Sequence, residues 1–430
     1  MSRAGAFGVR IAAAAILLVA LAALLVGWLN VRGEAPLVDE VGEHATLAAV
    51  VRGSYLARVG NCAGCHTRRG GAAYAGGKGI ATPFGTVYAS NLTPDPKTGI
   101  GQWTSAQFWR AMHNGRAADG RLLYPAFPYP SFTEMTRADS DALYAWLRTL
   151  APVAQANRPH ELRFPYGLQA SLAAWRALFF APGVYEPVVE RSVQWNRGAY
   201  LVRSLGHCAA CHSPRNVFGA TRGSLELSGG LIPMQNWYAP SLASRTEAGV
   251  ADWPPQEVAA LLRGGISAHG AALGPMADVV AGSTQYLDDA DLAAMVEFLR
   301  SLPQAPASTP ARDAPRAGAD TRAHGAALYK THCAACHGEA GEGGASGGGI
   351  VYAALAGNRK VLLDSPTNLI RIVVNGGFPP GTAGNPRPFG MPPFGAVLSD
   401  AEIADLASYV RGAWGNSAPA VGAVDVLVAR

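Results

Sequence analysis

The feature that most constrains this chain is a short cysteine–histidine motif that occurs three times. The motif is Cys-x-x-Cys-His, and it contains all six cysteines of the 430-residue chain. Its members are Cys62, Cys65 and His66; Cys208, Cys211 and His212; and Cys333, Cys336 and His337. Two intervening residues place both sulfurs on one side of a helical turn, and the histidine follows at once. Both thiols can then add to the vinyl groups of a haem, with the histidine as fifth iron ligand, so the sequence predicts three covalently bound haem c cofactors.

A Cys-x-x-Cys pair alone also occurs in zinc sites and in redox-active dithiols. Here a histidine follows the second cysteine every time, and the sequence has no further cysteine to complete another kind of site. We therefore set the zinc and thioredoxin-like interpretations aside. Because haem is attached outside the bacterial cytoplasm, the motif also predicts a periplasmic location.

The motifs belong to an internal repeat with an interval of about 125–146 residues. Each repeat opens with a short helical signature and closes with an amphipathic helix, predicted at Ser140–Leu150, Asp288–Leu302 and Ser399–Trp414. Ser399 and Glu402 read as a capping box for the last of these helices. No strand pattern competes, so the predicted fold class is all-α. The predicted haem domains are residues 41–155, 191–303 and 321–416.

The amino terminus carries one apolar stretch. Arg3 and Arg10 precede an uninterrupted run of 19 residues, Ile11–Leu29. A helix needs about 20 apolar residues to cross a bilayer, whereas a cleavable signal has about 7–15 before a small-x-small site. The run ends in Gly27-Trp-Leu-Asn30, a poor cleavage site, so we predict an uncleaved anchor over residues 1–32, with a cleaved signal as the alternative. The flanking arginines predict haem domains on the periplasmic side of the inner membrane.

Composition and the segments between the motifs complete the outline. Charged residues make up 15% of the chain, and its net charge of +5 forms no basic stripe, so nucleic-acid binding is not expected. Residues 156–190 form an apolar linker around Trp175–Phe180. We expect it to pack between the first two haem domains, with contact to a membrane or a partner subunit as the alternative. Residues 304–320 read as an exposed linker, and the tail, 417–430, is expected to be poorly ordered.

The sixth iron ligand decides whether a haem transfers electrons or offers an open site. A methionine thioether closes the iron and raises its reduction potential. For the third haem, Met391 lies in a Gly/Pro-stiffened stretch just before the final helix. For the second haem, Met276 holds the corresponding place. Met234 is a rival, but the repeat aligns it with Phe84.

The first haem has no methionine at this place. Met276 lies twelve residues beyond the glycine that follows a short helix, and the same step in the first repeat reaches Phe127, which cannot ligate iron. We therefore predict Met135, eight residues further on, as the sixth ligand. Its alternative role is packing ahead of the closing helix. The other candidates are Met112 and His113.

These residues carry a family resemblance. From about Gly53 to Trp414 the chain resembles the triple-haem cytochrome c subunits of bacterial membrane-bound dehydrogenases for alcohols, sugars, sugar acids and aldehydes. The most specific stretches are Ala81–Tyr88, Asn91–Pro96, Leu123–Tyr129, Gly274–Ala277 and Gly384–Phe394. The resemblance implies three tandem class-I-like cytochrome c domains behind one transmembrane helix. Family members often carry methionine where Phe127 stands, so this chain departs from the family there.

From the resemblance we expect an electron-transfer subunit that is not an enzyme on its own. A periplasmic dehydrogenase with a flavin, quinone or molybdenum cofactor would deliver electrons, and ubiquinone or another respiratory acceptor would receive them. Two alternatives are a haem enzyme with an open sixth site, of the peroxidase or thiosulfate-oxidising type, and a free periplasmic electron carrier. Catalysis at iron would need an open or displaceable sixth position, which Met276 and Met391 oppose for two haems.

Overall fold

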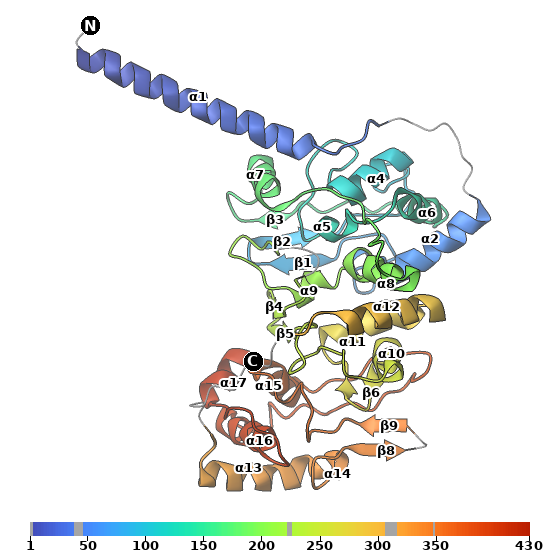
Figure 1. The fold of residues 1–430 in the computed structure, drawn as a ribbon, viewed down its shortest axis with the longest axis vertical. Coiled ribbons are helices and arrows are strands. Elements are labelled where there is room, and N and C mark those ends of the chain that lie inside the picture. The colour runs from blue at the N-terminus through green and yellow to red at the C-terminus, as the bar shows by residue number, and fades with distance from the viewer. Residues whose placement is uncertain (1–2, 38–45, 222–225, 306–315, 347–348) are drawn as a thin grey trace. The chain divides into compact units, whose positions relative to one another are not determined.

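The computed structural model describes residues 3–37, 46–221, 226–305, 316–346 and 349–430 (Figure 1). Its contacts divide the chain into two compact units. The first consists of residues 1–54, 65–185 and 217–220, and the second of residues 55–64, 186–216 and 221–430. The second and third Cys-x-x-Cys-His motifs lie wholly in the second unit. The boundary passes through helix α3 (Cys62–His66), which carries the first motif.

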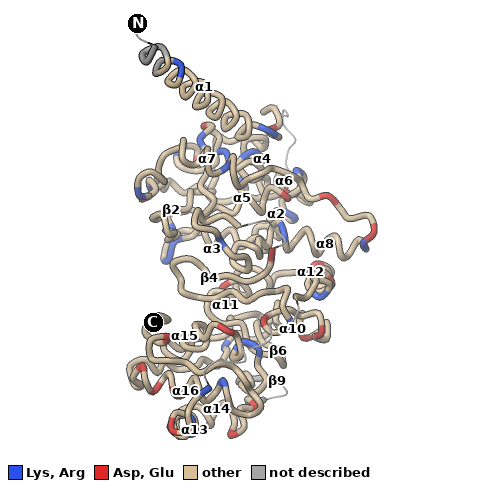
Figure 2. The backbone as a smooth tube through the Cα atoms, turned by 60° about the vertical axis from the view of Figure 1, so that its left-hand side comes forward, with Lys and Arg blue, Asp and Glu red and all other residues tan. Residues whose placement is uncertain are grey.

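Helix α1 (Arg3–Val31) contains the predicted anchor. Its segment Arg10–Val31 contains an 18-residue window with a mean hydropathy of 2.7 and is long enough to cross a membrane. No charged residue interrupts it after Arg10, and this part of α1 is tan in Figure 2. Among the described residues it is the only helix that meets these conditions.

The first unit contains further helices. Besides α3, they are α2 (Leu47–Val59, which crosses the unit boundary), α4 (Ser105–Asn114), α5 (Tyr129–Phe132), α6 (Arg137–Leu147) and α7 (Gln169–Phe179). The closing helix α6 begins three residues before its predicted start. Thr136 is the reason, because its side chain accepts a hydrogen bond from the Asp139 backbone N–H and so caps an earlier first turn.

The second unit contains two further helical sets. The first comprises α8 (Val193–Arg203), α9 (Ala209–His212), α10 (Pro255–Gly264), α11 (Pro275–Gly282), the 3₁₀ turn η1 (Thr284–Tyr286) and α12 (Asp289–Ser301). The second comprises α13 (Ala319–His332), α14 (Ala334–His337), α15 (Thr367–Asn375), α16 (Asp400–Gly412) and α17 (Ala423–Ala429). The predicted capping box is confirmed, since Ser399 and Glu402 each bond the other's backbone N–H at the start of α16.

The protein is mostly helical, but short antiparallel strands also occur, which the sequence did not predict. They are β1 (Gly79–Thr82), β2 (Gly85–Tyr88), β3 (Glu161–Leu162), β4 (Gly230–Ile232), β5 (Trp237–Ala239), β6 (Ile266–Ser267), β7 (Gly270–Ala271), β8 (Gly344–Ser346) and β9 (Gly349–Tyr352). β3 extends the β1–β2 hairpin, and the other strands pair two by two. With two to four residues each, they are too short for an alternating apolar pattern to show in the sequence.

The opening and closing helices of each repeat cross at a glycine. A Cβ added at Gly198 in α8 would lie 2.5 Å from the carbonyl carbon of Ala294 in α12, and these two helices run side by side (Figure 1). Gly53 meets Ala142 of α6 in the same way, and Gly325 of α13 meets Asp405 of α16. Close helix packing therefore explains why each opening helix has a glycine at this position.

A side-chain contact to a carboxylate accompanies each crossing. The residue before the glycine reaches a carboxylate on the closing helix: Arg52 bonds Asp139, Arg197 forms a two-point pair with Asp291, and His324 bonds Asp405. The contact with the carboxylate and the absence of a side chain at the glycine together determine how the two helices of a repeat pack.

The carboxyl-terminal tail is ordered, contrary to the sequence-based expectation. α17 packs against α15 and α16, and its Val426 is fully buried. Arg371 donates to the carbonyl of Ala429, and Arg430 pairs with Asp400. This short apolar stretch packs on the third repeat, and that contact could not be predicted from the sequence of the tail itself. Of the predicted linker 304–320, residues 306–315 lie outside the described part.

Candidate haem sites

The three motif histidines share one hydrogen-bonding arrangement. The Nδ1 atoms of His66, His212 and His337 lie 2.7, 2.7 and 2.9 Å from backbone carbonyl oxygens. A carbonyl can only accept, so each Nδ1 carries the proton and each Nε2 keeps its lone pair. Burial also lowers the pKa of all three imidazoles, which favours the neutral form that binds metal. Each ring is therefore prepared to be an axial iron ligand.

The carbonyls that hold the histidines come from a repeated Tyr-Ala segment. These carbonyl groups belong to Ser90, Pro240 and Ala353, which follow Tyr88, Tyr238 and Tyr352 by one or two residues. In each repeat this tyrosine lies in the second strand of a hairpin: β2, β5 and β9. The Tyr-Ala pair recurs in the sequence at Tyr88, Tyr238 and Tyr352, but its role becomes apparent only in the structure. The short hairpins matter because they bring this backbone back to the motif helix.

The surroundings of Cys65, Cys208 and Cys333 disfavour the thiolate form that redox chemistry needs, because burial raises the pKa of each thiol. No disulfide joins any of the six motif cysteines. Burial raises the pKa of Cys208 to about 12 and that of Cys333 to about 11. A redox-active Cys-x-x-Cys instead has a depressed thiolate pKa. Within the described part of the chain no three Cys, His, Asp or Glu side chains gather as a metal site of the zinc type.

One apolar cavity of about 440 Å³ in the second unit contains both of that unit's motifs. Cys208, Cys211 and His212 line it together with Cys333, Cys336 and His337. About half of the remaining lining is aliphatic, part of it from α10, α12, α15 and α16, as expected for a space that holds an apolar macrocycle. The two haem sites therefore open into the same interior space.

The two predicted methionine ligands also line this cavity. Met276 is the second residue of α11, and Met391 is held by a pair of backbone hydrogen bonds with Gly377, at 2.8 and 3.0 Å. The rival Met234 has 64% of its surface exposed and lies outside the cavity lining. Each haem site of the second unit thus has a histidine and a methionine around one apolar space.

Lys360 gives an independent test of whether haem fits this cavity. Its side chain lines the cavity, and its Nζ donates to the carbonyl of Ala271 at 2.9 Å. Burial lowers its pKa to about 8, and no carboxylate pairs with it among the described residues. An ammonium held away from water needs an anionic partner. The propionates of a haem would supply that charge, so the residues present fit the cofactor.

The structure places the first repeat's ligand candidates as follows. The Leu123 N–H bonds the carbonyl of Gly115, and the Ala272 N–H bonds that of Gly265 in the second repeat. Phe127 and Met276 each come four residues after these donors. The hydrogen-bond register therefore agrees with the sequence count that sets Phe127 opposite Met276.

Met135 is completely buried, one residue before Thr136, the N-cap of α6. Leu287 and Leu398 hold the same position before α12 and α16. Packing alone thus accounts for the burial of Met135, and its role as an iron ligand stays a prediction.

Met112 and His113 are buried on α4, and His113 stacks on Trp109. The Nδ1 of His113 donates to the carbonyl of Thr133 at 2.7 Å, so its Nε2 also keeps a lone pair. Both residues remain candidates for the first haem.

Comparisons with known proteins agree with this geometry. A family model described as Cytochrome c matches residues 50–151, 196–303 and 323–414. The chain is 39% identical over 404 residues to the cytochrome c subunit of alcohol dehydrogenase (quinone) from Gluconacetobacter polyoxogenes, covering 90% of this chain and 85% of the relative. It is 39% identical over 408 residues to the gluconate 2-dehydrogenase cytochrome c subunit of Pantoea cypripedii, covering 90% and 91%. One of the nicotinate dehydrogenase subunits of Pseudomonas putida is 43% identical over 394 residues, covering 90% of this chain and 32% of that protein.

Proposed function

Because the chain belongs to the cytochrome c family and carries three covalently bound haem c groups, we propose that it is the electron-transfer subunit of a membrane-bound dehydrogenase. Electrons from a periplasmic catalytic subunit would pass through the haems to ubiquinone or another respiratory acceptor. The relatives of matching length are named as cytochrome c subunits, which transfer electrons and are not the catalytic parts.

The observation that carries this proposal is the cavity shared by the second and third motifs. Two haems in one apolar space would lie close enough for direct electron exchange. His212 and His337 would hold the irons from one side, and Met276 and Met391 from the other. Each haem supplies a one-electron centre, and the thioethers would keep these irons closed to substrate. The arrangement suits a relay better than catalysis at iron.

Helix α1 supports the proposed membrane location and the proposed acceptor. A spanning helix would hold the haem domains at the periplasmic surface of the inner membrane, where a lipid-soluble quinone is available. The catalytic partner's cofactor stays open among flavin, quinone and molybdenum. The match to the nicotinate dehydrogenase chain spans only a third of that longer protein, so it leaves the partner's chemistry open.

The function is tested by following haem reduction in the full chain purified from its native membranes with a tag. We expect substrate to reduce the haems only in preparations that also contain the dehydrogenase subunit. The isolated chain should be reducible by dithionite but oxidise no alcohol, sugar or sugar acid. Substrate oxidation by the isolated chain would contradict the proposal.

For the first haem we propose His66 with Met135, and Met135→Leu tests the second ligand. Leucine already holds this place as Leu287 and Leu398 in the other repeats, so the variant should fold normally. We expect one of three haems to become high-spin and to bind carbon monoxide, as measured by absorption and electron paramagnetic resonance spectra.

Three unchanged low-spin haems in Met135→Leu would show that Met135 only packs in the core. The sixth ligand would then be sought with leucine substitutions of Met112 and His113. The wild-type spectrum also tests the haem-enzyme alternative. A high-spin haem that binds carbon monoxide before any substitution would favour that alternative, because catalysis at iron needs an open sixth position.

A further inference from the structure

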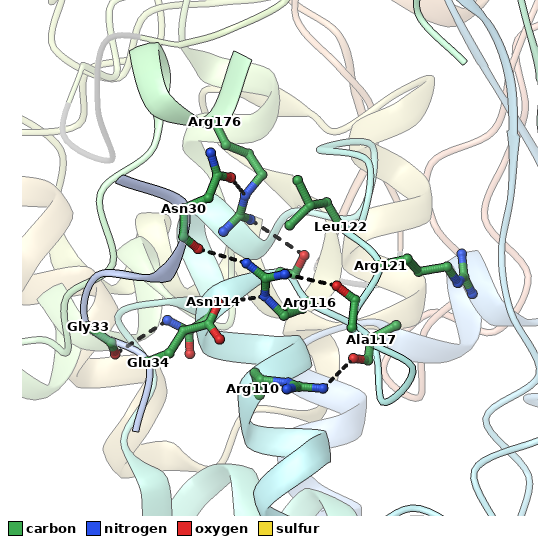
Figure 3. A network of polar contacts seen from close by, with 12 residues as sticks. Asn30, Gly33, Glu34, Arg110, Asn114, Arg116, Ala117, Arg121, Leu122 and Arg176 are labelled. Atoms are coloured by element: carbon green, nitrogen blue, oxygen red, sulfur yellow. Dashed lines mark hydrogen bonds and ion pairs between the residues drawn. The ribbon is translucent and has the colours of Figure 1, made fainter. Parts of the chain in front are cut away.

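The end of α1 is fixed to the first unit by a buried polar network (Figure 3). Asn30 is 6% exposed, and its Nδ2 donates to the carbonyls of Val26 in α1 and Ala173 in α7, both at 2.9 Å. The Nε of Arg176 in α7 donates to the Oδ1 of Asn30 at 2.8 Å. The Asn30 carbonyl accepts from Arg116 at 2.9 Å, and Arg116 also pairs with Glu34 at 2.6 Å. The end of helix α1 is therefore not a free tether, because hydrogen bonds of Asn30 fix it to α7.

The segment around α7 exposes several apolar side chains, and the charged side chain of Arg32, from outside the segment, donates to the Phe180 carbonyl at 3.1 Å. Between Phe164 and Tyr185 the only charged residue is Arg176, and its side chain is buried in the network just described. The exposed apolar residues are Phe164 at 86%, Tyr166 at 41%, Leu168 at 48%, Leu178 at 74% and Val184 at 42%. We call these five residues the α7 surface. A soluble surface normally intersperses charges with such residues, so this one points to a non-aqueous neighbour.

The position at which α7 contacts α1 indicates that this non-aqueous neighbour is the bilayer. The apolar run of α1 ends at Leu29, and α7 contacts the next residue, Asn30. The exposed Trp28 lies at the same end of the run, where indole rings favour the interface between lipid and water. A helix fixed at this level would lie where the acyl chains meet the headgroups. Segments that bury an apolar face in this boundary bind with a strength that grows with the apolar area buried.

We propose that the α7 surface rests in the headgroup–acyl boundary of the same bilayer that α1 spans. This inference relies on the proposed membrane anchor but not on the identity of the dehydrogenase. It gives the first haem domain a second membrane contact, and the Asn30–Arg176–Arg116 network sets the orientation between the two. The first haem domain would then keep one fixed orientation relative to the membrane.

The test uses the holo-protein in lipid nanodiscs with one introduced thiol. The six native cysteines are bound to haem, so Leu178→Cys provides a single reactive site. Val51→Cys is the matched control, because Val51 is an apolar residue with 62% exposure on α2, away from α7 and the end of α1 (Figure 1). We measure the rate of alkylation by an anionic, water-soluble maleimide. We expect a rate at least about tenfold lower for Leu178→Cys, because lipid excludes the reagent and disfavours the thiolate.

The outcomes separate this inference from the proposed function. Equal alkylation rates at both positions, with the protein still in the nanodisc, would overturn the inference and leave the anchor intact. Protection of Leu178→Cys only after the dehydrogenase is added would also overturn it, since a protein partner would then cover the surface. Release of the chain from nanodiscs would instead contradict the anchor itself. Leu168→Cys serves as a second site and should be protected in the same way.

Discussion

Replacing Met391 with leucine is expected to lower the reduction potential of the third haem and to slow quinone reduction by the complex. Leucine nearly conserves the volume of methionine, so the main loss is the sulfur. We expect a fall on the order of 100 mV, because axial ligands alone move haem potentials over a range of about 0.8 V. Met276→Leu should do the same at the second haem, since both side chains line the shared cavity.

Potentiometric titration of the haem absorption measures the change, and quinone reductase assays measure its consequence. The partner's activity with an artificial dye should survive, because the dye takes electrons before the haems. Met234→Leu is the matched control, since Met234 is 64% exposed and outside the cavity lining, and it should alter neither quantity. Full quinone reductase activity in both Met391→Leu and Met276→Leu would show that the proposed relay is wrong.

The sequence revealed the chemistry of the haem sites better than their surroundings. Each Cys-x-x-Cys-His motif is local, so the attachment residues and fifth ligands could be predicted from spacing alone. The shared cavity did not, because it joins Met276 with Met391 through contacts between residues far apart in the chain. Lys360 was missed for the same reason: a single lysine has no pattern, and its significance lies in the cavity that it lines.

Helices were predicted better than strands and ends. The closing helices carry a clear apolar period, and only the capping by Thr136 moved the start of α6. The hairpins that carry Tyr88 and Tyr238 are too short for a period to appear. The tail was misjudged because α17 is stable only through its contacts with α15 and α16.

The helix crossings provide the prediction with the largest expected effect on stability. At Gly198 a Cβ would stand 2.5 Å from the Ala294 carbonyl carbon and 2.9 Å from the Cβ of Phe298. A backbone carbonyl cannot move aside as a side chain can, so α8 and α12 would have to separate. Separation would also stretch the Arg197–Asp291 pair, which now has two hydrogen bonds of 2.7 Å.

We therefore expect Gly198→Ala to destabilise the second haem repeat by about 3 kcal/mol, at the upper end of the usual cost of overpacking. For a repeat of this size that corresponds to a fall in melting temperature of roughly 10 °C or more. Circular dichroism in the haem region, followed with temperature, measures it. Gly412→Ala is the matched control, because Gly412 ends α16 with open space around its Cα and should gain slightly in stability. An unchanged melting temperature for Gly198→Ala would show that the close crossing does not hold the repeat together.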